Sequence, residues 1–99
     1  MAPNSSLRKR VAALPDRPGV YLLKDARGTT LYVGKALSLR KRVGSYFRPR
    51  GLAPRIAQLM KRVVDLDIRL TASEAEALLL EDQLIKSRQP QYNVAFRDD

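Results

Sequence analysis

The fold is decided by two short β-prone runs, Gly19-Val20-Tyr21 and Leu31-Tyr32-Val33-Gly34-Lys35, and by the nine residues that separate them. The separating stretch contains Asp25 and Gly28, two residue types that are typical of tight turns. Two β-prone runs joined through a short polar connection that contains glycine predict a β-hairpin.

Side-chain alternation along this hairpin makes a prediction about its two faces. Because successive side chains of a strand point to opposite faces, Tyr21 and Tyr32 are expected to lie side by side on one face. Gly34 shares that face and is expected to leave a gap beside the two phenols. Leu31 and Val33 are expected on the opposite face.

The rest of the chain shows helical and extended patterns in turn. The helix signals are apolar residues at helical spacing, serines at N-cap positions and prolines at helix boundaries. The extended signals are alternation and a chain that folds back after Pro90. We expect helices over residues 6–14, 38–47, 54–63 and 73–88, a third strand over residues 67–71, and an edge segment over residues 92–96.

The composition limits the chemistry that is available. With 99 residues the chain has room for one domain with a modest core. It contains no cysteine and no histidine, so thiolate nucleophiles, cysteine zinc sites and the commonest general base are all excluded. No apolar run approaches the length of a membrane span or of a signal sequence, and we expect a cytoplasmic protein.

The net charge of +9 is spread unevenly. Residues 1–62 contain fifteen lysines and arginines against two acidic residues, whereas residues 63–99 contain four basic and eight acidic residues. This asymmetry indicates a polyanion-binding face beside a separate acidic element. A plain solvated surface explains the same composition, and a membrane-binding helix is disfavoured because the cationic helix has no large apolar face.

Glu81 is the most unusual residue of the pattern. It lies near the middle of an apolar arc on the helix over residues 73–88, formed by Ala77, Leu78, Leu80, Leu84 and Ile85. An ionised carboxylate is costly in such a stripe unless it is paired or bound to a metal. Two readings stay open: a buried ion pair with an arginine, or an oxygen ligand for a hard cation such as Mg²⁺.

The two tyrosines also allow two readings. Tyr21 and Tyr32 are ordinary residues for a β-sheet. A tyrosine can instead act as a base where neighbouring cations favour its phenolate, and Lys35 and Arg42 are candidates to supply that field.

Taken together, five features carry a specific resemblance: Gly19-Val20-Tyr21, Tyr32-Val33-Gly34, Arg42, Glu81 and Asn93. In order and spacing they resemble the GIY-YIG nuclease family, and most of all the nuclease domain at the N-terminus of the bacterial excision-repair incision subunit. Valine replaces isoleucine in both halves of the signature, a conservative change. The resemblance covers residues 14–99, which we expect to form the nuclease domain, with residues 1–13 as an N-terminal tail or short helix.

The resemblance implies an α/β (α+β) fold in which a small three-stranded antiparallel sheet is flanked by helices. It implies phosphodiester hydrolysis with one divalent metal ion, Mg²⁺ or Mn²⁺. By position, Glu81 would hold the metal, Tyr32 would be the general base, and Arg42 would neutralise charge on the phosphate. The supporting positions that shape the pocket would be Tyr21, Lys35, Tyr46 and Asn93.

The resemblance also implies a partner. It predicts incision of duplex DNA on the 3′ side of a lesion, within a repair complex whose other proteins bind segments that this chain lacks. The phosphates would be held by the basic residues of the first part of the chain, among them Arg40, Lys41, Arg48 and Arg50. The alternative is a basic nucleic-acid-binding module that keeps the fold without catalysis, and it gives no reason for Glu81.

Overall fold

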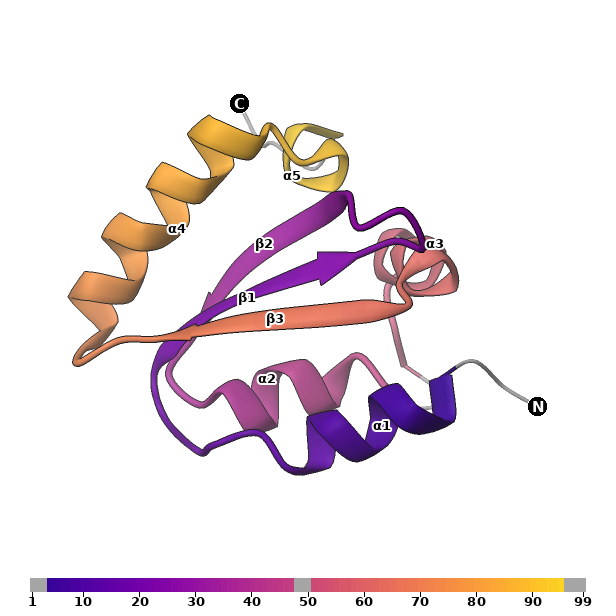
Figure 1. The fold of residues 1–99 in the computed structure, drawn as a ribbon, viewed down its shortest axis with the longest axis horizontal. Coiled ribbons are helices and arrows are strands. Elements are labelled where there is room, and N and C mark those ends of the chain that lie inside the picture. The colour runs from indigo at the N-terminus through magenta and orange to yellow at the C-terminus, as the bar shows by residue number, and fades with distance from the viewer. Residues whose placement is uncertain (1–3, 48–50, 96–99) are drawn as a thin grey trace.

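The computed structural model describes residues 4–47 and 51–95 (Figure 1). Its three strands form one antiparallel sheet in the order β2-β1-β3, so the hairpin strand β1 is central. The expected α/β fold with a three-stranded antiparallel sheet is confirmed. The elements are α1 (Asn4–Ala12), β1 (Gly19–Lys24), β2 (Thr30–Ala36), α2 (Leu39–Ser45), α3 (Pro54–Arg62), β3 (Asp65–Leu70), α4 (Glu74–Arg88) and α5 (Gln91–Ala95).

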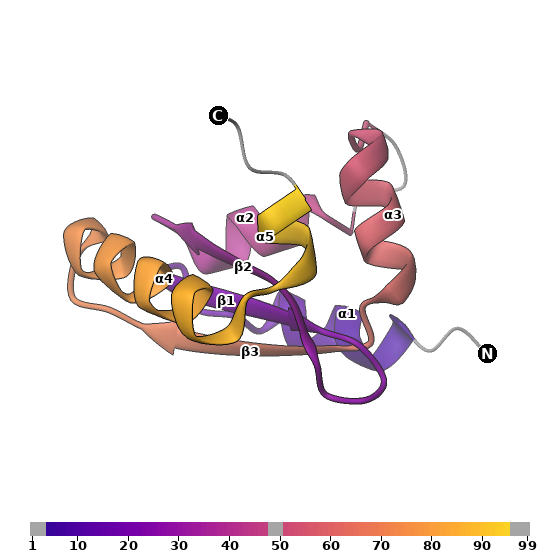
Figure 2. The ribbon, with the colours of Figure 1, turned by 90° about the horizontal axis from the view of Figure 1, so that it is seen from above.

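Helices cover both faces of the sheet (Figures 1 and 2). On one face, residues of α1, α2 and α3 pack with Tyr21, Leu23 and Leu66 in the larger buried cluster. On the other face, Ala77 of α4 packs with Val20, Leu22 and Val33 in the smaller one. Both clusters use β1, because the central strand is buried on each side. Among the described residues no helix is long and apolar enough to cross a membrane.

Helix α1 belongs to the larger cluster through Leu7 and Val11, which are 2% and 5% exposed. The side chain of Arg40 on α2 fixes the segment after α1, because its Nε donates to the Leu14 carbonyl oxygen over 2.8 Å. The domain boundary expected between residues 13 and 14 stays a prediction. The buried core includes residues on the N-terminal side of that boundary.

The hairpin is confirmed, with one irregularity. Asp25 organises the turn: its Oδ1 accepts from the backbone N–H groups of Arg27 and Thr29, and Gly28 adopts a φ of +82°. The register shifts next to Leu23, so Leu31 has no direct partner on β1. The bulge turns Leu31 into the larger cluster, on the side of Tyr32. Strict alternation was therefore wrong for Leu31 and right for Val33.

The expected gap beside Gly34 is filled by the Tyr21 ring. The two residues are direct partners across the hairpin, and a Cβ on Gly34 would come within 2.3 Å of the Tyr21 Cζ and hydroxyl oxygen. Tyr21 is 2% exposed. The glycine therefore makes room for a neighbouring phenol and leaves no hollow of its own.

The edge segment expected over residues 92–96 is wrong where the structure describes it. Gln89 ends α4 with a left-handed conformation, φ 47°, and its N–H donates to the Ile85 carbonyl oxygen. Pro90, which has no N–H to donate, follows, and the chain then forms the short helix α5 against β2. The Asn93 N–H donates to the carbonyl oxygen of Pro90, the residue before α5, and the segment is helical, so it does not extend the sheet.

The apolar arc of α4 is narrower than its sequence indicates. Ala77 is fully buried, whereas Leu78 is 51% and Leu79 67% exposed. One helix crosses this face of a three-stranded sheet, so only the stripe that includes Leu80 and Leu84 reaches the smaller cluster. Including Leu78 in the buried arc was wrong.

The contact between Tyr21 and Gly34 predicts a measurable cost. Gly34→Ala should lower the free energy of unfolding by about 1–3 kcal/mol, because the added methyl group must displace a buried ring. Urea unfolding followed by circular dichroism measures the change.

Gly44→Ala is the matched control, since its added Cβ has no atom within 4 Å and Gly44 lies inside α2. It should raise the free energy of unfolding by about 0.5–1 kcal/mol. Equal effects of the two substitutions would contradict the packing argument.

Candidate active site

The outer edge of β2 is the frame of the candidate site. Strand β2 pairs only with β1, so its other edge would be left without partners. Asn93 of α5 pairs with this edge, since its Oδ1 accepts from the Val33 N–H over 2.7 Å and its Nδ2 donates to the Val33 carbonyl oxygen over 2.9 Å. The Asn93 amide hydrogen-bonds both backbone groups of Val33, as a neighbouring strand would. It therefore holds the backbone next to Tyr32 in place.

Three tyrosines meet beside this edge. The Tyr21 and Tyr46 hydroxyl groups are 2.6 Å apart, and the Tyr21 ring centroid lies 6.2 Å from that of Tyr32 and 5.8 Å from that of Tyr46. Burial raises the pKa of Tyr21 far above its ordinary value, with the neighbouring Tyr46 adding to the effect. Tyr21 is therefore a neutral hydrogen-bonding phenol at any working pH.

Tyr32 is less buried than Tyr21, and charged groups on α2 and α4 act on it. The pKa of Tyr32 is raised to about 12, mainly by burial and in smaller part by Tyr46 and the negative charge of Glu81. The guanidinium of Arg42 acts in the opposite direction. Arg42 and Glu81 are therefore both near enough to act on Tyr32, and their assignment to one catalytic site stays a prediction. The protein's own groups keep the Tyr32 phenol protonated at neutral pH, so its phenolate requires a further positive charge nearby.

Glu81 faces the same edge from α4. Its side chain is partly buried, and desolvation raises the pKa of its carboxyl group. The charge and the backbone N–H of Lys35 partly offset this shift. Within residues 4–47 and 51–95, no arginine forms an ion pair with Glu81, so the reading as a buried arginine pair receives no support there.

The donor set around Glu81 fits a divalent cation of the magnesium type. The described part of the chain holds no group of three acidic or other metal-ligating side chains. Mg²⁺ commonly binds through one or two carboxylates and keeps several waters, whereas a zinc site needs more protein ligands. A single carboxylate at an accessible edge suits the first ion and not the second.

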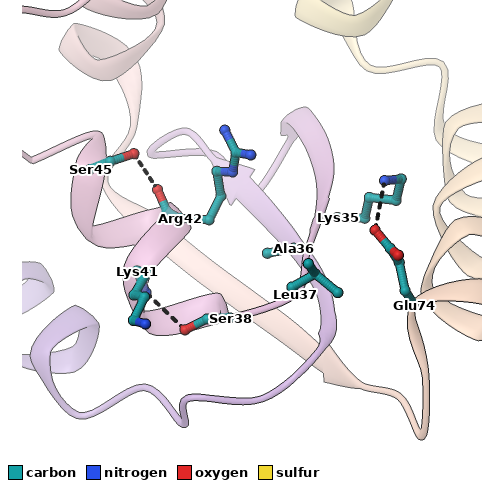
Figure 3. Close-up of a pocket in the computed structure, with 8 residues that line it drawn as sticks. All are labelled: Lys35, Ala36, Leu37, Ser38, Lys41, Arg42, Ser45 and Glu74. Atoms are coloured by element: carbon teal, nitrogen blue, oxygen red, sulfur yellow. Dashed lines mark hydrogen bonds and ion pairs between the residues drawn. The ribbon is translucent and has the colours of Figure 1, made fainter.

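A hollow of about 520 Å³ opens between α2 and the start of α4 (Figure 3). Lys35, Lys41 and Arg42 supply three positive charges to its lining, and Glu74 supplies the opposite charge. Figure 3 shows the Arg42 side chain rising from α2 and Lys35 on the far side beside Glu74. The remaining lining is Ala36, Leu37, Ser38 and Ser45.

The local sequence explains how α2 holds its cations at this hollow. Ser38 caps the helix, and its Oγ accepts from the Lys41 N–H over 3.3 Å. Leu39 and Val43 are fully buried against the sheet, so Arg42 lies beside the buried stripe and stays exposed.

The remaining predicted residues have different positions. Lys41 lines the hollow, and the Nε of Arg40 is bonded to the Leu14 carbonyl oxygen, so part of its guanidinium serves the fold. Arg48 and Arg50 lie outside the described residues. Glu74 also lines the hollow, and the sequence did not single it out, because a glutamate in the first turn of a capped helix is read as a helix-end residue.

The hairpin with its two tyrosines, the arginine of α2 and the glutamate of α4 define a domain of the GIY-YIG class. The model of the UvrC-like GIY-YIG domain matches residues 17–94. The chain belongs to this family.

Curated relatives and solved structures agree with this assignment. The chain is 54% identical over 89 residues to UvrABC system protein C of Nitrosomonas europaea, covering 90% of this chain and 15% of the relative. It is 48% identical over 98 residues to the protein of the same name from Dehalococcoides mccartyi strain BAV1, covering 98% of this chain and 16% of the relative. The chain thus spans about one sixth of the length of these relatives.

Among solved structures, the GIY-YIG N-terminal endonuclease domain of UvrC from Thermotoga maritima matches with a TM-score of 0.81 and 34% identity. The match covers 90% of this chain and 97% of that chain. That structure is described as bound to its catalytic divalent cation, magnesium. The comparison supports the fold over nearly the whole domain.

The environment of Glu81 predicts a pH-dependent stability difference. A carboxyl group whose pKa is raised by folding destabilises the folded state where it is ionised, and this penalty vanishes below its unfolded pKa, near 4.5. Without added metal, Glu81→Gln should therefore unfold at higher urea than the parent at pH 7 and at the same urea near pH 4.

Asp82→Asn is the comparison variant, because Asp82 is exposed and pairs with Lys86. Its charge is the smallest cause that raises the pKa of Glu81, so it should change stability at pH 7 less than Glu81→Gln does. A large loss of stability in Glu81→Gln at pH 7, about 3–5 kcal/mol, would instead indicate that a buried ion pair had been broken.

Proposed function

We propose that this domain is a metal-dependent DNA endonuclease that hydrolyses one phosphodiester bond. The observation that supports the proposal is that the charges of Arg42 and Glu81 both act on the Tyr32 hydroxyl group, which lies beside the edge of β2. A tyrosine, a guanidinium and a partly desolvated carboxylate serve different needs of one hydrolytic reaction, and nothing in the packing of a small sheet requires them together.

The cations of the hollow would bind the substrate backbone. Arg42 would donate hydrogen bonds to the non-bridging oxygens of the scissile phosphate and offset the charge that builds up during attack. Lys35, on the other wall of the hollow, would hold the same strand as a point charge. Because these contacts involve phosphates only, binding should depend on salt and little on base sequence.

Tyr32 would take the proton of the attacking water. The water oxygen forms a bond to phosphorus as its proton passes to the Tyr32 phenolate, and the leaving oxygen departs from the opposite side of the phosphate and is protonated by solvent. Tyr21 and Tyr46 would orient the phenol through their hydrogen bonds. Asn93 would keep the strand in place beneath it.

Glu81 would hold one divalent ion, Mg²⁺ or Mn²⁺. Such an ion supplies the positive charge that lowers the pKa of a nearby water or phenol and offsets negative charge on the phosphate. This positive charge would lower the raised pKa of Tyr32 and so favour its phenolate.

The biological substrate we propose is damaged duplex DNA held in a repair complex, cut on the 3′ side of the lesion. This rests on the relatives named UvrABC system protein C, of which the chain spans about 15%. Recognition of the lesion and of partner proteins would reside in other segments, and the reaction would take place in the cytoplasm. The isolated domain should therefore nick DNA slowly.

The proposal predicts how three variants behave in a plasmid-nicking assay with Mg²⁺ or Mn²⁺. Tyr32→Phe, Arg42→Ala and Glu81→Gln should each reduce nicking by at least about a hundredfold, because each removes a group that acts on the reacting atoms. Binding of the plasmid, measured by mobility shift over a range of salt, should stay close to that of the parent.

Arg27→Ala is the matched control for lost positive charge, because Arg27 is exposed in the hairpin turn. It should nick at the parental rate. If all three site variants nick as the parent does, the residue assignment is wrong. If the parent binds DNA and never nicks under any metal, the non-catalytic binding module is the better description.

A further inference from the structure

Glu74 is the acidic residue in the lining of an otherwise cationic hollow (Figure 3). Its Oε2 lies 3.9 Å from the Lys35 Nζ. The Glu74 side chain is 57% exposed and that of Lys35 is 35% exposed, so both groups are accessible to solvent and to a bound substrate. A carboxylate here opposes the binding of phosphate, and therefore needs another explanation.

Lys35 interacts with a second carboxylate of the same helix. The Lys35 backbone N–H donates to the Glu81 side chain, and the Lys35 ammonium is near enough to act on that carboxylate as well. Glu74 and Glu81 are seven residues apart on α4, which is close to two helical turns and places them on one side of the helix. Lys35 of β2 thus faces two acidic residues that follow one another along α4.

Pairing of the Lys35 ammonium has opposite consequences at the two carboxylates. A cation held by Glu81 and the ammonium of Lys35 repel each other, so an ammonium that pairs with Glu81 competes with the metal for the same oxygen atoms. An ammonium that pairs with Glu74 remains at the wall of the hollow, where a phosphate could reach it.

We propose that Glu74 is a positioning residue that holds Lys35 at the hollow and away from Glu81, so that Glu81 stays available to a divalent cation. The inference rests on the proposed role of Glu81 as metal ligand. Glu74 does not touch the cation or the substrate in this account, and acts only through Lys35.

The test measures metal binding to the 99-residue chain without DNA, using Mn²⁺ and electron paramagnetic resonance. Glu74→Gln should raise the Kd for Mn²⁺ by about threefold, the size expected when one exposed ion pair is lost. Glu76→Gln is the matched control. It removes the same charge from the same turn of α4, while its side-chain oxygen can still accept from the Ala72 N–H.

A double-mutant cycle separates the proposed action through Lys35 from a general loss of negative charge. In a Lys35→Met background, Glu74→Gln should leave the Kd for Mn²⁺ unchanged, because there is no ammonium left to position. Glu74→Asp, which keeps the charge, should recover part of the parental affinity. Thermal unfolding of each variant without metal should stay close to that of its own background.

Three results would overturn the inference. The first is a loss of Mn²⁺ affinity by Glu74→Gln that persists in the Lys35→Met background, the second is a loss equal to that of Glu76→Gln, and the third is no loss at all. Glu81→Gln distinguishes this failure from a failure of the proposed function. If Glu81→Gln binds Mn²⁺ as tightly as the parent, the metal site itself is wrong; if it loses binding and Glu74→Gln does not, only the role of Glu74 is wrong.

Discussion

The contact of the Tyr21 ring with Gly34 underlies the rest of this domain. A phenol that lies directly over a strand partner without a side chain is buried in the sheet, and still reaches Tyr46 at the end of α2 with its hydroxyl group. That hydrogen bond links the hairpin to the helix that carries Arg42. The ring thus helps to place α2 against the hairpin, together with the buried Leu39 and Val43 of the same cluster.

The two edges of the sheet are closed in different ways, and the difference makes the site possible. On β3, Arg10 donates to the Leu66 carbonyl oxygen and pairs with Asp65, so a cation covers that edge. On β2, a neutral amide from Asn93 satisfies Val33. Next to this amide lie the Glu81 carboxylate of α4 and the Tyr32 phenol of β2. Burial raises the pKa of both groups. Desolvation raises both pKa values more than Lys35 and Arg42 lower them, so a further cation nearby would favour the ionised form of each group.

Much of the fold could be predicted because it follows from local signals. Asp25 and Gly28 specify the turn, Ser38 and Ser73 cap their helices as expected, and Pro54 begins α3. The predictions were wrong where contacts with other elements of the fold determine the local structure. The bulge that turns Leu31 inward depends on pairing with β1, and residues 91–95 form a helix because the Asn93 side chain, and not the backbone, meets the edge of β2.

The sequence by itself determined which groups are present: a carboxylate out of place in an apolar helix, two tyrosines in a hairpin, and an arginine at the border of a helix face. These follow from residue type and spacing, which are local properties of the chain. Only the tertiary structure decided that Lys35 of β2 lies near both Glu74 and Glu81 of α4, and that Leu78 is exposed. The reason is physical: ion pairs and burial depend on distances between elements far apart in the chain, and those distances are fixed only when the sheet and its helices pack.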